Sequence, residues 1–197
     1  MASNELVETI MRCTAGVDWS KYLRDKKVLE LGAGECTYLP HLLTKGKPIC
    51  YVASDIFEDR YALARKVLAS EFQNLEFRIL RADNIELPDN SFDTILAFGL
   101  YHHLPDLLGV FREAYRVLRS GGALIFRDPY AVNPAIYFKY LLIKRSMNEW
   151  PLSIRRTKKT LKQAGFSIER VNRFWLRFPR LPGGIWSTNI GFVARVR

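Results

Sequence analysis

The feature that most constrains this chain is a short apolar run ending in two glycines, VLELGAG at residues 28–34. Aliphatic and β-branched residues with little polar alternation are typical of a buried parallel strand. Because glycine has no Cβ, Gly32 and Gly34 allow a tight turn and let a ligand lie against bare backbone, while the helix that follows offers unpaired N–H groups. Two glycines also occur in plain turns, so the pair alone predicts a nucleotide-type site only weakly.

Three further apolar runs end beside acidic, amide or imidazole side chains. They are residues 49–55, which end in Asp55; 75–80, followed by Asp83 and Asn84; and 92–99, followed by His102 and His103. Asp55 comes twenty-one residues after Gly34, a spacing at which a strand-end carboxylate can meet a ribose. Because parallel strands end at one edge of a sheet, we expect these polar residues to form one rim.

The order of these segments carries a family resemblance. The segments are ELGAG at 30–34, SD at 54–55, ADN at 82–84, LPDNSFD at 87–93, HHLPD at 102–106 and VLRSGG at 117–122. Together they resemble the successive motifs of the class I S-adenosylmethionine-dependent methyltransferases, of the small-molecule, UbiE-like type, over about residues 26–128. NAD-binding Rossmann proteins are the near alternative, but they would have a third glycine where this chain has Thr37.

The resemblance implies an α/β chain with a three-layer Rossmann-like methyltransferase fold, whose seven-stranded sheet is mostly parallel with an antiparallel last strand. It also implies S-adenosyl-L-methionine as cofactor, with Glu30 and the glycine backbone at the amino-acid part, Asp55 at the ribose and Asp83 at the adenine edge. The residues implied in cofactor binding are Glu30, Gly32, Ala33, Gly34, Asp55, Ile56, Asp83, Asn84 and Phe98. Ordinary strand-end capping by Asp55 and Asp83 and core packing by Ile56 are the alternatives. Burying Glu30 unpaired is costly, which favours a ligand contact or a backbone hydrogen bond.

Four residues are candidates for a catalytic base. His102 and His103 follow the fourth strand, where open α/β sheets place their ligands, and an imidazole can take a proton near neutral pH. Asp128 and Tyr130, at the end of the fifth strand, are the next candidates. The alternatives are a helix-start histidine packed near the cofactor and simple loop capping.

We expect a single methyltransferase domain over 1–197. Its expected parts are an N-terminal cap at 1–26, a cofactor-binding core at 27–128, a substrate-side insert rich in aromatic residues at 129–165 and C-terminal strands at 166–197. Predicted helices cover 4–12, 38–44, 58–70 and 106–119, with Gly121 just past the last of these, and a further helix runs from an N-cap at Ser153 to Ala164, before Gly165. Predicted strands cover 28–31, 49–55, 75–80, 92–99, 123–127, 166–174 and 190–196.

Composition fits one globular domain without a metal site. The chain has 197 residues, of which 48% are hydrophobic and 25% charged. Cys13, Cys36 and Cys50 are scattered and lack metal-ligand spacing, so we expect reduced packing residues. No signal peptide is visible, and the apolar stretch at 130–143 is too short and too interrupted for a bilayer, so a cytoplasmic protein without a transmembrane segment is expected.

Positive charge is concentrated in the C-terminal part. Residues 1–120 hold 15 Lys and Arg against 17 Asp and Glu, whereas 121–197 hold 15 against 3. A solvated surface, steering of an anionic substrate, RNA binding or a lipophilic, membrane-associated acceptor would each fit this charge. No Asn-Pro-Pro-Tyr-type motif follows the fourth strand, which disfavours methylation of a nucleic-acid base. The sequence therefore favours methyl transfer to a small molecule, anionic or aromatic; RNA methylation and non-catalytic binding remain the alternatives, and the oligomeric state stays open.

Overall fold

The computed structural model describes residues 4–130, 152–175 and 187–197. Most of the aromatic insert expected at 129–165, namely 131–151, lies outside the described residues, as does the loop at 176–186. Every motif of the resemblance falls within 4–130 and can therefore be followed in the structure.

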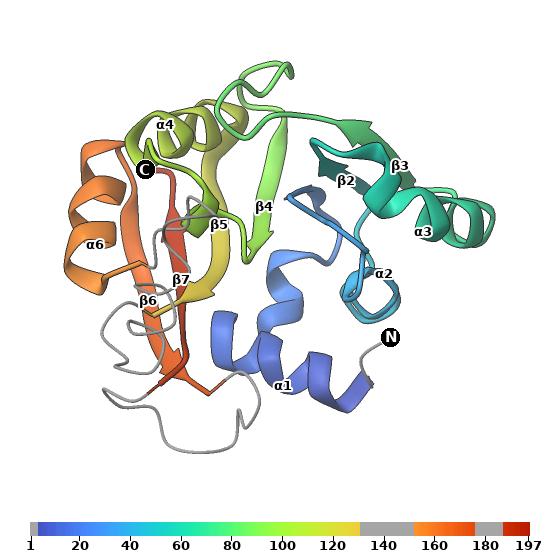
Figure 1. The fold of residues 1–197 in the computed structure, drawn as a ribbon, viewed down its shortest axis with the longest axis horizontal. Coiled ribbons are helices and arrows are strands. Elements are labelled where there is room, and N and C mark those ends of the chain that lie inside the picture. The colour runs from blue at the N-terminus through green and yellow to red at the C-terminus, as the bar shows by residue number, and fades with distance from the viewer. Residues whose placement is uncertain (1–3, 131–151, 176–186) are drawn as a thin grey trace.

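A seven-stranded sheet forms the centre of the molecule, in the order β3-β2-β1-β4-β5-β7-β6 (Figure 1). The strands are β1 (Lys27–Leu31), β2 (Cys50–Asp55), β3 (Leu75–Ile79), β4 (Phe92–Phe98), β5 (Leu118–Pro129), β6 (Ser167–Phe174) and β7 (Asn189–Arg195). Strands β1 to β5 pair in parallel, and β7 runs antiparallel between β5 and β6. The predicted fold class, including the antiparallel last strand, is confirmed.

Helices cover both faces of this sheet. Helices α1 (Asn4–Ala15), α2 (Leu39–Gly46) and α3 (Glu58–Glu71) share one apolar core with the sheet, together with the short 3-10 helix η1 (Trp19–Tyr22). Helices α4 (Leu107–Val117) and α6 (Ile154–Gln163) pack on the other face, in a second core. A second 3-10 helix, η2 (Tyr101–His103), follows β4. No helix in the described part of the chain is long and apolar enough to cross a bilayer.

Local sequence signals explain where α4 and α6 begin. The Asp106 side chain accepts hydrogen bonds from two backbone N–H groups of the first turn of α4, those of Leu108 and Gly109, at 3.1 and 3.0 Å. The Ser153 hydroxyl accepts from the N–H of Arg156, as predicted for an N-cap. Gly165 follows α6 with a φ of +103°, a conformation that glycine adopts at little cost.

The predicted end of α4 is wrong. The helix stops at Val117, and the chain enters β5 at once at Leu118, whereas the prediction continued the helix to 119 and placed Gly121 just past it. Leu118 is fully buried and pairs with Phe92 of β4, so tertiary packing draws it into the sheet. Gly121 instead lies within the span of β5, with a φ of +74°.

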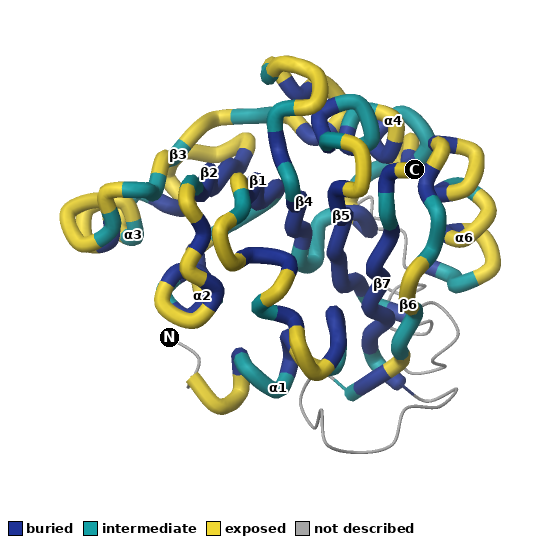
Figure 2. The backbone as a smooth tube through the Cα atoms, turned by 180° about the vertical axis from the view of Figure 1, so that it is seen from behind, coloured by how far each residue is buried: buried dark blue, intermediate teal, exposed yellow. Residues whose placement is uncertain are grey.

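Burial is uneven across the sheet, as Figure 2 shows. The backbones of β4, β5 and β7 are mostly buried, whereas β3 and α3 form an exposed edge. On α3 only Tyr61 and Leu68 are buried, while Leu63 and Val67 remain exposed. The carboxyl end of β2 therefore opens to solvent on the β3 side.

Helix α1 lies against the sheet beside β5, β6 and β7. The Asn172 side chain of β6 donates a hydrogen bond to the Cys13 carbonyl at 2.8 Å, and the backbone of Gly191 in β7 approaches Thr14 so closely that a Cβ there would lie 2.9 Å from its Cα. These contacts give α1 a packing role on the sheet. Its expected second role as a cap over the site stays a prediction.

Candidate functional site

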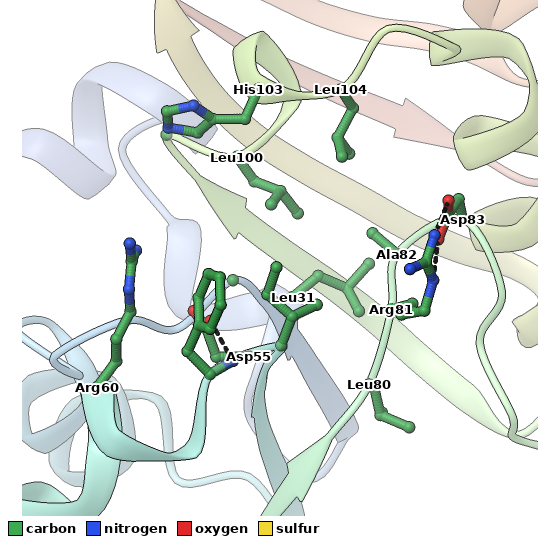
Figure 3. Close-up of a pocket in the computed structure, with 14 residues that line it drawn as sticks. Leu31, Asp55, Arg60, Leu80, Arg81, Ala82, Asp83, Leu100, His103 and Leu104 are labelled. Atoms are coloured by element: carbon green, nitrogen blue, oxygen red, sulfur yellow. Dashed lines mark hydrogen bonds and ion pairs between the residues drawn. The ribbon is translucent and has the colours of Figure 1, made fainter. Parts of the chain in front are cut away.

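A cavity of about 350 Å³ lies where the parallel strands end (Figure 3). Segments following β1, β2, β3 and β4 surround it, as expected for an open α/β sheet. The lining residues are Leu31, Gly32, Asp55, Ile56, Phe57, Arg60, Leu80, Arg81, Ala82, Asp83, Gly99, Leu100, His103 and Leu104. Of the residues predicted from sequence, five reach this cavity: Gly32, Asp55, Ile56, Asp83 and His103.

The glycine loop after β1 has the backbone that its sequence predicts. Gly32 and Gly34 have φ angles of +68° and +52°, in the left-handed region that favours glycine. A Cβ at Gly32 would lie 2.9 Å from the Leu100 side chain, so this position has no room for a larger residue. A Cβ at Gly34 would meet no atom within 4 Å, so the backbone there borders open space.

Asp55 connects this loop to the end of β2. Its Oδ2 accepts a hydrogen bond from the Gly34 N–H at 2.9 Å, and its Oδ1 accepts from the Phe57 N–H at 3.1 Å. Only 5% of the residue is exposed, yet it lines the cavity. Asp55 is therefore a strand-end cap and a cavity residue at once, and each carboxylate oxygen keeps a second lone pair for a ligand.

Two apolar side chains follow Asp55 and remain uncovered at the cavity wall. Ile56 is 54% exposed and Phe57 is 50% exposed, which is unusual for residues of their size. The sequence prediction included Ile56 but not Phe57. The signal was the same for both, because both follow the strand-end acid directly.

Asp83 enters the cavity on the β3 side, opposite Asp55 in Figure 3. Arg81 donates two hydrogen bonds to its carboxylate, Nε to Oδ1 at 3.0 Å and one terminal nitrogen to Oδ2 at 2.7 Å. This pairing holds the pKa of Asp83 below its usual range. Asn84 lies one residue further on and is not among the lining residues; its backbone N–H donates to the Arg81 carbonyl.

Three further residues predicted to bind the cofactor, Glu30, Ala33 and Phe98, do not line the cavity. Glu30 is buried on the α1–α2–α3 side, where its Oε2 accepts a hydrogen bond from the Tyr51 hydroxyl at 2.8 Å. Burial, with a smaller contribution from Asp55, raises the pKa of Glu30 to about 7. Ala33 and Phe98 pack against the core on the same side. None of the three is a lining residue, so the structure gives Glu30 a side-chain partner instead of direct access to the cavity.

His102 and Asp128 form a buried pair between the ends of β4 and β5. Asp128 Oδ1 accepts hydrogen bonds from the backbone N–H of His102 at 3.1 Å and from its ring Nδ1 at 2.7 Å. The side chain of Asp128 is fully buried, and that of His102 is 10% exposed. The His103 ring lies 3.9 Å from the His102 ring, centroid to centroid, and lines the cavity. The pair therefore lies directly behind the cavity residue His103.

Tyr130 is not part of this arrangement in the described residues. It is buried in the core on the α4–α6 side, and its backbone pairs with Leu152 and with Thr188. No hydrogen bond joins its side chain to His102 or Asp128 within the described ranges. A catalytic role for Tyr130 stays a prediction.

Sequence reasoning missed several cavity residues. Arg60 and Leu100 reach the cavity from α3 and from the segment before η2, and no motif includes them. Leu104 lies within the motif at 102–106, but no role in the site was predicted for it. Their approach follows from the folding of these segments over the strand ends, which a one-dimensional pattern does not reveal.

The residues present fit an adenosyl cofactor. The cavity combines a glycine backbone bordering open space, an acid at the end of β2, uncovered apolar side chains beside it and a second acid on the far wall. Hydroxyl, aromatic and amino groups of such a ligand would all meet suitable partners in it.

Comparison with known proteins agrees with this geometry. Residues 29–126 match the family described as "Methyltransferase domain". A demethylmenaquinone methyltransferase of Listeria monocytogenes is 30% identical over 163 residues, which cover 70% of this chain and 65% of that protein. A ubiquinone/menaquinone biosynthesis C-methyltransferase UbiE of Rickettsia akari is 38% identical over 98 residues, 48% of this chain and 39% of that one. This chain thus spans just under two thirds of the Listeria relative.

Solved structures share the fold. An S-adenosylmethionine-dependent methyltransferase from Mesorhizobium loti superposes with a TM-score of 0.71 at 18% identity, over 94% of this chain and 99% of that one. With motif order, sheet topology, cavity and family match in agreement, the chain belongs to the class I S-adenosylmethionine-dependent methyltransferases, with relatives of the UbiE-like type.

Proposed function

We propose that this chain transfers a methyl group from S-adenosylmethionine to a small-molecule acceptor with an acidic, aromatic hydroxyl system. The observation that carries the proposal is the buried His102–Asp128 pair next to the strand-end cavity. A histidine oriented by a buried carboxylate is an arrangement suited to general-base catalysis.

The cavity residues have distinct roles in this proposal. Asp55 accepts hydrogen bonds from the ribose hydroxyls, Ile56 and Phe57 contact the adenine face, and Asp83 contacts the adenine edge. The open backbone at Gly34 leaves room for the amino-acid part. When bound, S-adenosylmethionine supplies a methyl group on a positively charged sulfur, already activated for transfer.

His102 is the proposed base. Because Asp128 accepts from the Nδ1–H, a tautomer that we assign from the hydrogen bond, neutral His102 carries its basic lone pair on Nε2. That nitrogen takes the acceptor's proton, whose departure leaves an electron pair on the acceptor for the new bond to the methyl carbon. The imidazolium that results is stabilised by the Asp128 carboxylate. Exclusion of water from this buried pair strengthens both interactions.

As the new bond to the methyl carbon forms, the bond between the methyl carbon and sulfur would break and leave its electron pair on sulfur. Where the acceptor atom is a ring carbon, that carbon then loses its own hydrogen as a proton, and the His102 imidazolium returns a proton to the hydroxyl oxygen.

The proposed acceptor class is a quinol or a related aromatic hydroxyl compound. The names of two relatives, a demethylmenaquinone methyltransferase and a ubiquinone/menaquinone biosynthesis C-methyltransferase, support this class. Deprotonating one hydroxyl of a quinol makes its ring carbons nucleophilic, which is the task given to His102. The excess of 15 basic over 3 acidic residues in 121–197 would favour approach of such an anion.

The test uses the full-length chain with radiolabelled S-adenosylmethionine and reduced demethylmenaquinone bearing a short side chain. We expect labelled, methylated quinol and an equal amount of S-adenosylhomocysteine, with His102→Gln as the inactive control. If calorimetry detects no binding of either S-adenosyl compound, the methyltransferase proposal is refuted in favour of a non-catalytic binding protein. Binding without methylation of any aromatic hydroxyl compound would refute the acceptor class alone.

RNA methylation is the second candidate, and the exposed face of α6 favours it. Five cationic side chains lie there, Arg155, Arg156, Lys158, Lys159 and Lys162, and none of them pairs with a carboxylate among the described residues. Labelling a cell extract with and without ribonuclease separates the two candidates. Label that disappears with ribonuclease would replace the small-molecule acceptor by RNA.

We also propose a cytoplasmic location. Cys13, Cys36 and Cys50 are all free thiols, which suits a reducing compartment. Fractionation of cells that produce the tagged chain tests this, and recovery outside the cytoplasmic fraction would refute it.

A further inference from the structure

Arg127, near the end of β5, is a buried cation with an incomplete set of partners. Only 6% of the residue is exposed. One terminal nitrogen donates to Asn189 Oδ1 and the other to the Tyr38 hydroxyl, both at 3.3 Å, and Nε is buried without a hydrogen-bond partner. A guanidinium carries five N–H donors, so these two long bonds use fewer than half of them.

The charge of Arg127 is also unmatched. In the described part of the chain no carboxylate forms an ion pair with it, and its other neighbours are the rings of Tyr38 and Phe98, whose centroids lie 5.7 and 5.9 Å from the guanidinium carbon. Removing a cation from water is costly, and neutral acceptors with aromatic faces offset that cost only in part. An anionic ligand would complete the site.

Arg127 lies close to the segments that border the expected cofactor site. Its carbonyl accepts a hydrogen bond from the N–H of the cavity residue Gly99 at 2.7 Å, and its partner Tyr38 follows the glycine loop. Arg127 and Asp128 are consecutive in a strand, so their side chains point to opposite faces. Asp128 meets His102 on one face, and Arg127 lies on the other with Tyr38 and Phe98.

We infer that Arg127 binds a carboxylate in the active site. Its planar fork of N–H groups matches a carboxylate in two parallel hydrogen bonds, an interaction that a lysine cannot reproduce. The carboxylate comes either from the amino-acid part of the cofactor or from an acceptor that carries a carboxylate beside the aromatic hydroxyl proposed above, and only the second source rests on that proposed acceptor. Two pairs of ligands distinguish these sources.

The first pair is S-adenosylhomocysteine and its decarboxylated analogue, titrated by calorimetry. If Arg127 binds the cofactor carboxylate, the wild type prefers the intact compound by about ten- to a hundredfold, and Arg127→Met removes most of this preference. The matched control is Arg112→Met, which deletes an exposed cation on α4 and keeps the preference.

The second pair is 2-naphthoate and the neutral 2-naphthamide, titrated with and without saturating S-adenosylhomocysteine. If Arg127 binds an acceptor carboxylate, the wild type prefers the naphthoate by about tenfold or more and Arg127→Met does not. Arg127→Lys keeps the charge without the fork and retains part of the preference, which separates bidentate binding from general attraction.

Thermal unfolding of each variant checks that a lost preference does not come from a loss of folding. Removing an unpaired buried cation is expected to leave the Tm of Arg127→Met unchanged or raise it; if this variant does not fold, Arg127→Lys decides the question. The inference is overturned if neither carboxylate is preferred by the wild type, or if Arg127→Met keeps every preference intact. A wild type that binds no S-adenosyl compound would refute the proposed function, and the naphthoate pair without cofactor would then still decide the role of Arg127.

Discussion

Replacing Asp128 by Asn tests whether the His102–Asp128 pair is catalytic. Asp128 Oδ1 accepts two hydrogen bonds from His102, one from the backbone at 3.1 Å and one from the ring at 2.7 Å. The amide oxygen of Asn can accept both, so the geometry survives. The negative charge that stabilises a protonated imidazole is lost.

The size of the effect follows from the loss of one charge-assisted hydrogen bond in a buried site. Hydrogen bonds to charged groups contribute about 1.5 to 3 kcal/mol, so kcat should fall roughly 10- to 150-fold. The Kd of S-adenosylhomocysteine should stay constant, because Asp128 does not line the cavity.

The stability of the same variant should change in the opposite direction from its activity. Asp128 Oδ2 is buried without a hydrogen-bond partner, as is the hydroxyl of Tyr101, whose pKa is raised by burial and by the Asp128 charge. A neutral amide removes the buried charge and its effect on the Tyr101 hydroxyl. The free energy of unfolding at pH 7 should therefore be equal to the wild-type value or higher.

The assay is initial-rate kinetics with saturating cofactor, together with urea unfolding of each variant. Asp106→Asn is the matched control, because Asp106 caps α4 through two backbone N–H groups and asparagine caps equally well. His102→Gln combined with Asp128→Asn should be no slower than His102→Gln alone, since the aspartate acts through the histidine. A folded Asp128→Asn with unchanged kcat, or a double variant with multiplied losses, would refute the reasoning.

Three further predictions concern stability and the cofactor. Lys47 closes α2 with a φ of +50°, so Lys47→Gly should stabilise the fold by about 1 kcal/mol, whereas Lys45→Gly inside α2 should destabilise it by about as much; urea midpoints that shift in the same direction would contradict this. Burial raises the pKa of Glu30 from 4.5 to about 7, so its stabilising contribution is full below pH 4.5 and is lost as the pH rises through 7. Glu30→Gln should therefore exceed the wild type in unfolding free energy by up to about 3 kcal/mol at pH 8 and by little at pH 4, and melts with equal differences at both pH values would exclude the effect. Asp55→Asn should weaken S-adenosylhomocysteine binding by about tenfold or more in calorimetry, because the side-chain amide has only one acceptor oxygen where the carboxylate has two. Asp83 is more exposed, so Asp83→Asn should weaken this binding less. The reverse order of the two affinities would show that the two acids had been assigned wrongly.

Much of the fold could be predicted because its signals are local. Each parallel strand is a continuous apolar run, and the observed bounds of β1 to β4 differ from the predicted ones by one residue at an end. The end of α4 could not be predicted in the same way. Leu118 has a helical pattern around it, but its burial beside Phe92 depends on a strand far away in the sequence. Local propensity loses to such packing.

The site divides in the same way. Gly32, Asp55 and Asp83 could be assigned to the cavity because each directly follows a strand, and strand ends converge at one edge. Glu30 could not be placed, because its partner Tyr51 lies on the neighbouring strand and their contact depends on sheet register. A buried acid in an apolar run indicates that some partner exists, but it does not identify that partner.

The two faces of β5 explain why Arg127 and Asp128, the two charged residues at its end, belong to no single sequence motif. Arg127 and Asp128 interrupt the apolar run at 123–126, and alternation along the strand sends them to opposite sides of one strand end. Asp128 meets His102, which a motif places after β4, so its role becomes visible once β4 and β5 pair. Arg127 meets Tyr38 and Asn189, which come from segments before and after it that no motif connects. A charged dipeptide that ends a buried parallel strand is therefore a site signal in its own right, since burying either charge there without a partner is costly.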